Sequence, residues 1–408
     1  MKKFILNISI SLLIVLLLVV SYYLYDNEKN KEILINNKKI LTDINKHYNK
    51  YVITTKKSNI YKKANGKYIS IGTINSGEKL TLKDTIIKLS TKYIKIDNTN
   101  YYIYYKDVEK IDEFINDDRY KNYIYFNEKL KTKNSFSLYR DNKEIYIFNE
   151  AMDFQILIKD DNRYGVVYDN LLYYILKDDV EKIYTNEVDY REKATEIPVT
   201  VYHFLYLENE VCDEIICNSI KQVREEFDYL KQNNYFTINT KEMEYFINGK
   251  INLGKNSILI TIDDGARATN FLPVLDEYKI NATLFLISSW YKTSDFNSNY
   301  LELASHTNNL HTPGVCSGGQ GSPLKCMNKE EALKDLELSR KALNDTEAFC
   351  FPFYEYNDYA IDLVKTAGFK TAYIGGDKKA SIGINNYTIP RITIHNNISL
   401  DNYINLIK

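Results

Sequence analysis

The sequence predicts an α/β fold, a distorted (β/α) barrel in the second half of the chain, preceded by two small all-β barrels and a transmembrane helix. Three observations predict it: an uncharged apolar run near the N-terminus, a short segment that occurs twice, and alternating strands and helices from about Glu196 onward. At about 150 residues per domain, 408 residues suggest two or three domains.

The N-terminus is predicted to anchor the chain in the cell membrane. Lys2 and Lys3 precede a run from Phe4 to about Leu24 that carries no charge. About 20 apolar residues match the hydrocarbon core of a bilayer, and the lysines favour an N-terminus on the inside. Because no small-residue cleavage pattern follows, we expect an uncleaved, single-pass anchor over residues 1–25, with the later domains extracellular. The charged, helix-permissive residues 26–50 suit a stalk.

The cysteines agree with an oxidising, extracellular location. Cys212 and Cys217 are five residues apart, and Cys316 and Cys326 are ten apart, which suits two local disulfides, although four cysteines permit three pairings. A cysteine–histidine metal site is the alternative, but the chain has no C-x-x-C spacing. Cys350 is left over and is expected to be a buried thiol.

An internal repeat marks the predicted β-barrels. The segments "YYIYYKDVEKI" (101–111) and "YYILKDDVEKI" (173–183) are identical at eight of eleven positions, and "TKKSNIY" (55–61) and "TKNSFSLY" (132–139) match upstream of them. The units over 51–112 and 120–185 resemble bacterial Src-homology-3-like domains. Two interpretations stay open: their aromatic residues bind wall peptides or glycans, or the units are spacers with tyrosine-rich cores.

The predicted α/β domain spans 196–408. Apolar runs suited to buried strands alternate with segments whose apolar residues recur every three or four positions, as in helices. The strands are expected within 197–204, 235–238, 257–262, 282–287, 348–353 and 370–376, and the helices within 219–234, 239–249, 270–280, 328–345 and 358–369.

Polar groups gather where these strands end. Asp263 and Asp264 close one strand, His306 and His311 follow the next, and His203 ends the first. Functional groups of such folds collect at the C-terminal ends of parallel strands. Two imidazoles and one carboxylate suit Zn²⁺ or a similar ion with open positions for water, and a second carboxylate beside that water can act as base.

Three stretches give this pattern a family resemblance. "TIDDGARATNFLPVLDEYKINATLFLI" (261–287), "SHTNNLH" (305–311) and "AFCFPFYEYNDYAIDLVKTAGFKTAY" (348–373) resemble the first three motifs of the polysaccharide deacetylase family, the NodB-homology group. The spacing of the two histidines and the leading "VYHF" (201–204) are closest to the branch of poly-N-acetylglucosamine deacetylases. The resemblance covers about half of the chain.

The resemblance implies a role for each site residue. It makes Asp263 the general base, His203 the general acid that protonates the leaving amine, and a backbone N–H near Phe353 part of the oxyanion site in a substrate-binding role. Three metal ligands are implied: Asp264, His306 and His311. The implied cofactor is a divalent metal, Zn²⁺ first, with Co²⁺ and Ni²⁺ as alternatives.

The third motif departs from the family pattern. Cys350 stands where some members have an arginine, and Tyr354 stands at the usual glycine position. Arg391 either substitutes for the missing arginine beside Asp263 or is only a structural salt-bridge partner, and both interpretations stay open. His395 is a rival general acid, but we prefer His203.

The expected function is removal of acetyl groups from N-acetylglucosamine units of peptidoglycan or of poly-N-acetylglucosamine. The alternative is a catalytically silent glycan-binding protein. With a net charge of −1, nucleic acid is not an expected partner. The loop between His311 and Met327 either forms a wall of the glycan groove or is an inert surface loop.

Overall fold

The computed structural model describes residues 19–36, 38–39, 50–83, 92–112, 118–185, 189–212 and 214–408. Residues 19–36 are helical. None of the helices in the described ranges is both long enough and apolar enough to cross a membrane. Most of the predicted anchor, residues 1–18, lies outside the described residues, as do residues 37 and 40–49 of the predicted stalk.

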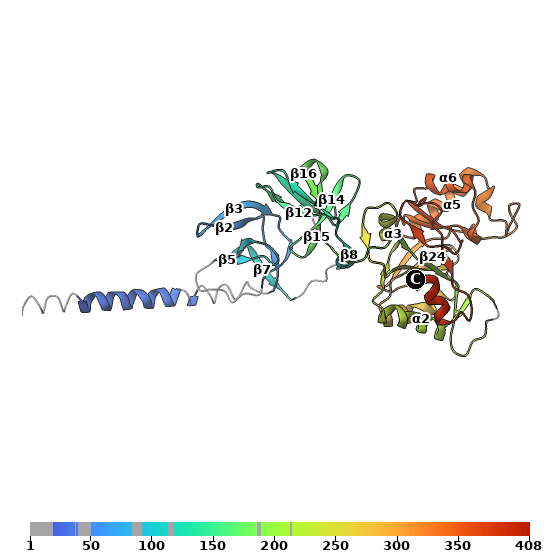
Figure 1. Cartoon of the computed structure of the whole chain (residues 1–408), viewed down its shortest axis with the longest axis horizontal. Coiled ribbons are helices and arrows are strands. Elements are labelled where there is room, and N and C mark those ends of the chain that lie inside the picture. Colours follow the sequence, from blue (N-terminus) through green and yellow to red (C-terminus); the bar gives the residue numbers. More distant parts are fainter. Residues whose placement is uncertain are drawn as a thin grey trace, which may run out of the picture. The chain divides into compact units, whose positions relative to one another are not determined.

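The chain divides into two compact units, drawn in blue to green and in yellow to red in Figure 1. The first comprises Met1–Asp118, Glu128–Ile156 and Asp161–Asn186. The second comprises Arg119–Asn127, Leu157–Asp160 and Glu187–Lys408. Residues 119–127, most of which we had expected to begin the second small barrel, therefore contact the α/β unit through β8 (Tyr123–Ile124), which pairs with β22 (Asn252–Leu253).

From Tyr51 onward the first unit is built of β-strands, as the repeat predicts. The strand pairings among its elements are antiparallel. Its strands are β1 (Tyr51–Thr54), β2 (Ser58–Ala64), β3 (Lys67–Ile74), β4 (Lys79–Thr81), β5 (Tyr93–Lys95), β6 (Tyr101–Tyr104), β7 (Val108–Ile111), β9 (Glu128–Thr132), β10 (Phe136–Arg140), β11 (Lys143–Phe148), β12 (Asp153–Gln155), β14 (Arg163–Tyr168), β15 (Leu171–Leu176) and β16 (Val180–Thr185). The likeness of the two copies to Src-homology-3-like domains stays a prediction.

The two copies of the repeat join through equivalent strands. β3 pairs with β11 so that Ile74 lies opposite Tyr146, and these residues are 72 apart, the offset that relates the repeated segments 101–111 and 173–183. Each copy therefore presents the same edge to the other, as in an isologous dimer interface.

Two ion pairs follow the same symmetry. Arg140 binds Glu78 at 2.6 Å, and Lys62 binds Glu150. The two glutamates are again 72 residues apart, and each cation follows the tyrosine that ends the upstream matching segment. The cation of each copy thus binds the glutamate of the other copy. The two copies therefore form a pseudo-twofold pair rather than two independent barrels.

The second unit is built on a parallel sheet, in the strand order β27-β26-β25-β24-β23-β18-β29, with β21 also paired to β23. The strands are β17 (Glu196–Ile197), β18 (Val199–Tyr202), β19 (Phe204–Tyr206), β20 (Cys217–Ser219), β21 (Phe236–Ile238), β23 (Ser257–Asp264), β24 (Ala282–Leu286), β25 (Leu301–Ser305), β26 (Ala348–Cys350), β27 (Thr371–Tyr373), β28 (Ala380–Ser381) and β29 (Ile392–Thr393). The helices are α2 (Ile220–Gln232), α3 (Thr240–Ile247), α4 (Leu272–Tyr278), α5 (Lys329–Ala342), α6 (Asp358–Thr366) and α7 (Leu400–Ile407). This order confirms the predicted βα alternation.

The helices pack by the apolar faces that the sequence pattern predicts. Val223, Phe227 and Leu230 of α2 recur at spacings of three and four and are fully buried. α3 begins with a capping box between Asn239 and Glu242. In Figure 1, α5 lies beside α6, and α2 lies beside the C-terminal helix α7.

The expected barrel is a parallel half-barrel sheet whose two edges are linked by one short segment. Ile389 forms a parallel bridge with Tyr373 of β27, and three residues further on β29 begins to pair with β18 at the opposite edge. Because this segment runs from one edge strand to the other, it carries Arg391 across the open side of the sheet.

Both predicted disulfides are present. Cys212 is bonded to Cys217, and Cys316 to Cys326, while Cys350 is a buried free thiol. The first closes the connection before β20. The second closes the loop that follows His311.

A buried carboxylic acid lies between helix α2 and strand β18. Glu226 of α2 is 1% exposed, Tyr202 donates to its Oε2 at 2.7 Å, and Gln222 donates to its Oε1 at 3.0 Å. Burial raises the pKa of Glu226 to about 7, although the two hydrogen bonds oppose the shift.

Glu226→Gln is expected to make the domain more stable at neutral and higher pH. The pKa of Glu226 rises from 4.5 to about 7 on folding, so the folded protein holds a proton that the unfolded chain has released. This contribution is fully present below about pH 4.5 and is lost as the pH rises through 7, by up to roughly 3 kcal/mol. Urea denaturation of wild type and Glu226→Gln at pH 5, 6, 7 and 8 measures it. Parallel pH dependence in the two proteins would contradict the prediction.

Candidate active site

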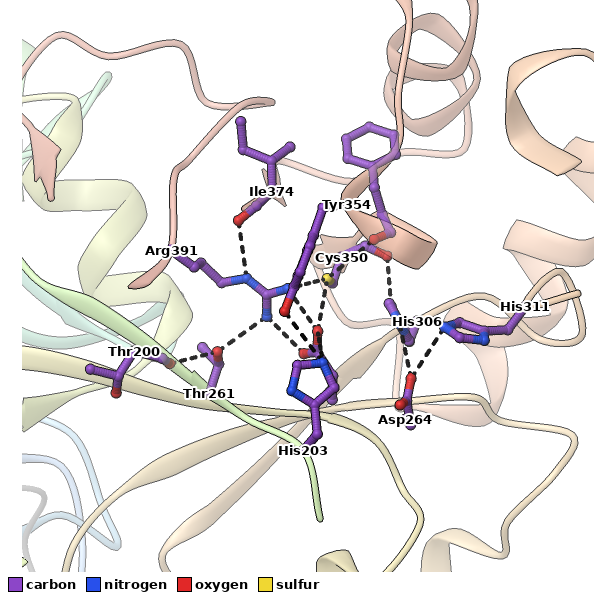
Figure 2. Close-up of polar contacts among 12 residues, drawn as sticks. Thr200, His203, Thr261, Asp264, His306, His311, Cys350, Tyr354, Ile374 and Arg391 are labelled. Atoms are coloured by element: carbon purple, nitrogen blue, oxygen red, sulfur yellow. Dashed lines mark hydrogen bonds and ion pairs between the residues drawn. The ribbon is translucent and has the colours of Figure 1, made fainter. Parts of the chain in front are cut away.

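The site lies at the C-terminal ends of adjacent parallel strands. Asp263 and Asp264 are the last residues of β23, and His306 directly follows β25. His203 follows β18 at the other side of β23. β18 is next to β23 in the sheet, and only β24 lies between β23 and β25. Side chains distant in the sequence therefore meet in one group at this edge, which Figure 2 shows in close-up.

The three predicted metal ligands converge. Nε2 of His306 lies 3.3 Å, and Nε2 of His311 3.2 Å, from the same oxygen, Oδ1 of Asp264. Their donor atoms all lie within 4.8 Å of one another. The three side chains point toward one another in Figure 2.

A turn explains how two histidines five residues apart can meet. Thr307 has a positive φ of 73°, which reverses the chain directly after His306. Asp335 of α5 then accepts hydrogen bonds from the amides of Asn308 and Asn309, both at 2.8 Å. The turn is therefore anchored to a helix, and His311 is returned toward Asp264.

The surroundings of His306 suit a metal ligand. Its Nδ1 lies 2.9 Å from the carbonyl oxygen of Cys350. A carbonyl only accepts, so Nδ1 carries the hydrogen and the Nε2 lone pair faces Asp264, which is the arrangement of metal-bound histidines. Burial opposes protonation, yet the acidic groups around the ring, Asp264 among them, raise the pKa of His306, so the pocket favours a positive charge here. Burial and the neighbouring His306 lower the pKa of His311 to about 4, which leaves its lone pair free. The donor set fits a divalent cation.

Arg391 pairs with the predicted base. Its Nη1 and Nη2 each donate to a different oxygen of Asp263 at 2.7 Å. Both side chains are buried, with Arg391 0% and Asp263 1% exposed. Burial alone would raise the pKa of Asp263, but the Arg391 charge and hydrogen bonds outweigh it and hold the pKa well below its usual range. The two interpretations left open for Arg391 thus describe one contact, a buried ion pair that also tunes Asp263.

Three further contacts fix the Arg391 guanidinium. It donates to Thr261 Oγ1 at 3.2 Å, to the Ile374 carbonyl at 3.3 Å and to Cys350 Sγ at 2.8 Å. Burial raises the pKa of the Cys350 thiol, so it stays neutral beside the ion pair. Cys350 therefore stands where some family members have an arginine, while Arg391 reaches Asp263 from the segment between β27 and β29.

His203 lies on the other side of Asp263. Its Nε2 is 4.0 Å from Asp263 Oδ2 and 3.3 Å from the Tyr354 hydroxyl. Burial lowers the pKa of His203, and the charge of Asp263 opposes this shift. His395, the rival acid, is exposed beyond β29, where its carbonyl accepts hydrogen bonds from Asn218 and Gln222. The structure brings His203 to the site and gives His395 a different setting.

Phe353 lies beside the metal ligands. Its ring centroid is 4.4 Å from that of His311. Phe353 and Tyr354 both have left-handed backbone conformations, with φ of 58° and 60°, in the turn that follows β26. This turn directs Phe353 to the metal side of the site and Tyr354 to the His203 side.

The sequence predicts no role at the site for two residues that the structure places there, Tyr354 and Trp290. Tyr354 stands out in the sequence only as a departure at the glycine position. The Trp290 indole donates to Asn309 at 2.6 Å, and its ring lies 5.9 Å from that of His311. Its position four residues after β24 is the signal that would have found it, because such strand ends form the site.

The loop after His311 is fastened at Glu355, directly after Tyr354. The Glu355 carboxylate accepts hydrogen bonds from the amides of Gly321 at 3.1 Å and Ser322 at 2.9 Å, and it pairs with Lys325 at 2.7 Å. Together with the Cys316–Cys326 disulfide, these contacts tie the loop to the turn that carries Phe353.

A family model matches the part of the chain that carries most of the site residues. Residues 250–372 match the family model described as polysaccharide deacetylase, a range that includes Asp263, Asp264, His306, His311 and Phe353. His203 and Arg391 lie outside it.

Two curated relatives illustrate the similarity. A poly-beta-1,6-N-acetyl-D-glucosamine N-deacetylase of Staphylococcus aureus (strain MSSA476) is 27% identical over 198 residues, which cover 43% of this chain and 67% of the relative. The enzyme of the same name from Staphylococcus epidermidis is 28% identical over 199 residues, with the same two coverages.

Solved structures of deacetylases also match. A de-N-acetylase from Aggregatibacter actinomycetemcomitans aligns with a TM-score of 0.46 at 22% identity, over 52% of this chain and 99% of that one. A polysaccharide deacetylase from Bacillus cereus aligns with a TM-score of 0.42 at 16% identity, over 81% and 99%. From the match over 250–372 and the similarity to the staphylococcal enzymes, we conclude that the chain contains a polysaccharide deacetylase domain and is a hydrolase of carbon–nitrogen bonds other than peptide bonds.

Proposed function

We propose that this protein removes acetyl groups from N-acetylglucosamine residues of a cell-wall or cell-surface polysaccharide, with the help of a divalent metal. One observation carries the proposal: an ionised, buried Asp263 lies between a three-donor metal group and His203. A site that only bound glycan would need neither the base nor the acid. The names of the staphylococcal relatives favour β-1,6-linked poly-N-acetylglucosamine, with peptidoglycan as the competing substrate.

Asp264, His306 and His311 would hold the metal, with Zn²⁺ first and Co²⁺ or Ni²⁺ as alternatives. When bound, the ion supplies Lewis acidity that polarises the acetamide carbonyl. The carbonyl of Cys350 keeps His306 in the tautomer that this role requires.

Asp263 acts as the general base. It accepts a proton from water as the water oxygen bonds to the acetamide carbon. Each carboxylate oxygen has a second acceptor position beside its Arg391 hydrogen bond, so the ion pair does not block this transfer. The low pKa keeps Asp263 ionised throughout the neutral range.

His203 acts as the general acid, and the Phe353 backbone as part of the oxyanion site. As the carbon–nitrogen bond breaks, the nitrogen keeps the electron pair and takes a proton from His203, so acetate and a free amine leave. An amine is a poor leaving group unless it is protonated, so the reaction requires this donor. The turn that holds the Phe353 ring next to His311 supports this role for its backbone amide.

We further propose that residues 1–25 anchor the protein in the cell membrane as a single-pass protein, with the later domains outside the cell. The uncharged run after Lys2 and Lys3 supports the anchor, and the two disulfides suit an oxidising exterior. The paired β-copies would then hold the deacetylase at the polysaccharide.

Acetate release by the full-length chain in detergent tests the function. We expect metal-stripped protein to be inactive, and Zn²⁺, Co²⁺ or Ni²⁺ to restore release from poly-N-acetylglucosamine or from peptidoglycan, assayed in parallel. Release from one polymer identifies the substrate. If the protein binds metal but releases acetate from neither polymer, the deacetylase proposal fails in favour of the silent glycan-binding protein.

A further inference from the structure

The hydroxyl of Tyr354 contacts the proposed acid. Its Oη lies 3.3 Å from His203 Nε2, and the two rings meet edge to face, with centroids 6.2 Å apart at 80°. The same ring lies 5.2 Å from the Arg391 guanidinium, which also contacts the ring of Phe285 at 5.5 Å. Tyr354 thus touches both the acid and the residue that tunes the base, as Figure 2 shows.

The backbone at Tyr354 indicates that its side chain has a use. Tyr354 has a φ of 60°, a left-handed conformation that is costly for a bulky residue and favours glycine. The neighbouring Gly375 leaves room for the Tyr354 ring, because a Cβ at position 375 would lie only 3.1 Å from a ring carbon. A tyrosine that brings backbone strain into an active site is more easily explained by its contacts than by packing.

His203 has few other ways to be oriented. Its Nδ1 is buried without a hydrogen-bond partner in the part of the chain that the structure describes. Among the residues that the structure describes, two polar groups contact its Nε2, the Tyr354 hydroxyl at 3.3 Å and Asp263 Oδ2 at 4.0 Å. Both oxygens of Asp263 are already held by Arg391. The closer partner, the phenol of Tyr354, is therefore the group that fixes the imidazole.

We propose that Tyr354 is a positioning residue for His203: its hydroxyl hydrogen-bonds Nε2 in the resting site and so holds the imidazole ring in place, and the Nε2–H turns from this contact to the leaving nitrogen during the reaction. The inference rests on the proposed deacetylase function. During the reaction His203, as the imidazolium, gives its Nε2 proton to the nitrogen, which keeps the electrons of the broken carbon–nitrogen bond, and His203 is left as the neutral imidazole. Tyr354 itself gains and loses no proton in the net reaction.

Two variants test this role. Tyr354→Phe removes only the hydroxyl, and Tyr354→Gly removes the whole side chain while relieving the left-handed strain. Tyr356→Phe is the matched control, because Tyr356 lies two residues away and is 39% exposed. On the acetylated polysaccharide we expect kcat to fall about tenfold in Tyr354→Phe and more in Tyr354→Gly, with KM unchanged.

The leaving group separates positioning from a structural effect. With 4-nitrophenyl acetate the departing nitrophenolate needs no proton, so a misplaced acid costs little. We expect the ratio of acetamide to aryl-ester turnover to fall about tenfold in Tyr354→Phe and to stay at the wild-type value in Tyr356→Phe. Equal losses on both substrates would mean that Tyr354 only supports the fold.

A spectroscopic measurement tests the contact without turnover. Histidine side-chain ¹⁵N spectra of the full chain, with the His203 signal assigned from a His203→Gln variant, are expected to show the Nε2–H form in wild type and a changed signal in Tyr354→Phe. An unchanged His203 signal together with unchanged kcat would overturn the proposal. If wild type releases no acetate, the proposed function fails, while the spectra still decide whether Tyr354 holds His203.

Discussion

Arg391→Met is expected to destabilise the α/β unit by about 3–5 kcal/mol and to remove most of the activity at neutral pH. The methionine leaves Asp263 buried at 1% exposure without its bidentate partner. Burial is then opposed only by the smaller effects of His306 and His203, so it raises the pKa of Asp263, and the base becomes protonated where the wild type is ionised. Urea denaturation at pH 7 and acetate release from pH 5 to 9 measure the two effects.

The direction of the pH effect follows from the ion pair. In wild type the folded pKa of Asp263 lies below its ordinary value of 3.8, so its stabilising contribution is present above about pH 4 and is lost only as the pH falls further. In Arg391→Met the acidic limb of the activity profile should move to higher pH, with partial recovery under alkaline conditions. Arg224→Met is the matched control, because Arg224 forms an exposed pair with Glu277 and should cost at most about 1 kcal/mol. A wild-type pH profile in Arg391→Met would show that the pair does not tune Asp263.

Asp263→Asn is expected to lower kcat by about 10³-fold while metal binding persists. An amide cannot take a proton from water, but Asp264, His306 and His311 are unchanged. The substitution also leaves the Arg391 charge without its carboxylate, so some loss of stability accompanies it. Acetate release and calorimetric Zn²⁺ titration of the same preparation measure both properties.

The comparison with an exposed aspartate makes this result specific. Asp362→Asn changes an exposed carboxylate on α6 and should leave activity and metal affinity as in wild type. If Asp263→Asn retains more than about a tenth of the wild-type kcat, another group is the base. If it loses metal as well as activity, Asp263 belongs to the metal site, and the roles of the two adjacent aspartates must be reassigned.

Much of the fold was predictable because it depends on local patterns. Period-two and period-3.6 spacing identified most strands and helices between 197 and 376, and short sequence separations identified both disulfides. The duplicated segment identified two β-copies, but not that Ile74 would pair with its equivalent Tyr146. A repeat in the sequence specifies similar edges, whereas which edges meet depends on how the copies pack.

The site shows the same division. The sequence by itself determined the Asp263–Asp264 pair at a strand end and His203 at the end of the first strand, because residue type and position along a strand are local properties. It also predicted that the two histidines follow a strand, but not that this strand is β25, which has no counterpart among the predicted strands. Only the tertiary structure decided that Arg391 neutralises Asp263 from 128 residues away and that Tyr354 meets His203 from 151 residues away. The physical reason is that these contacts depend on the order of the parallel strands and on the segment that runs from β27 to β29. Neither feature produces a periodic pattern of apolar residues that could be recognised in the sequence.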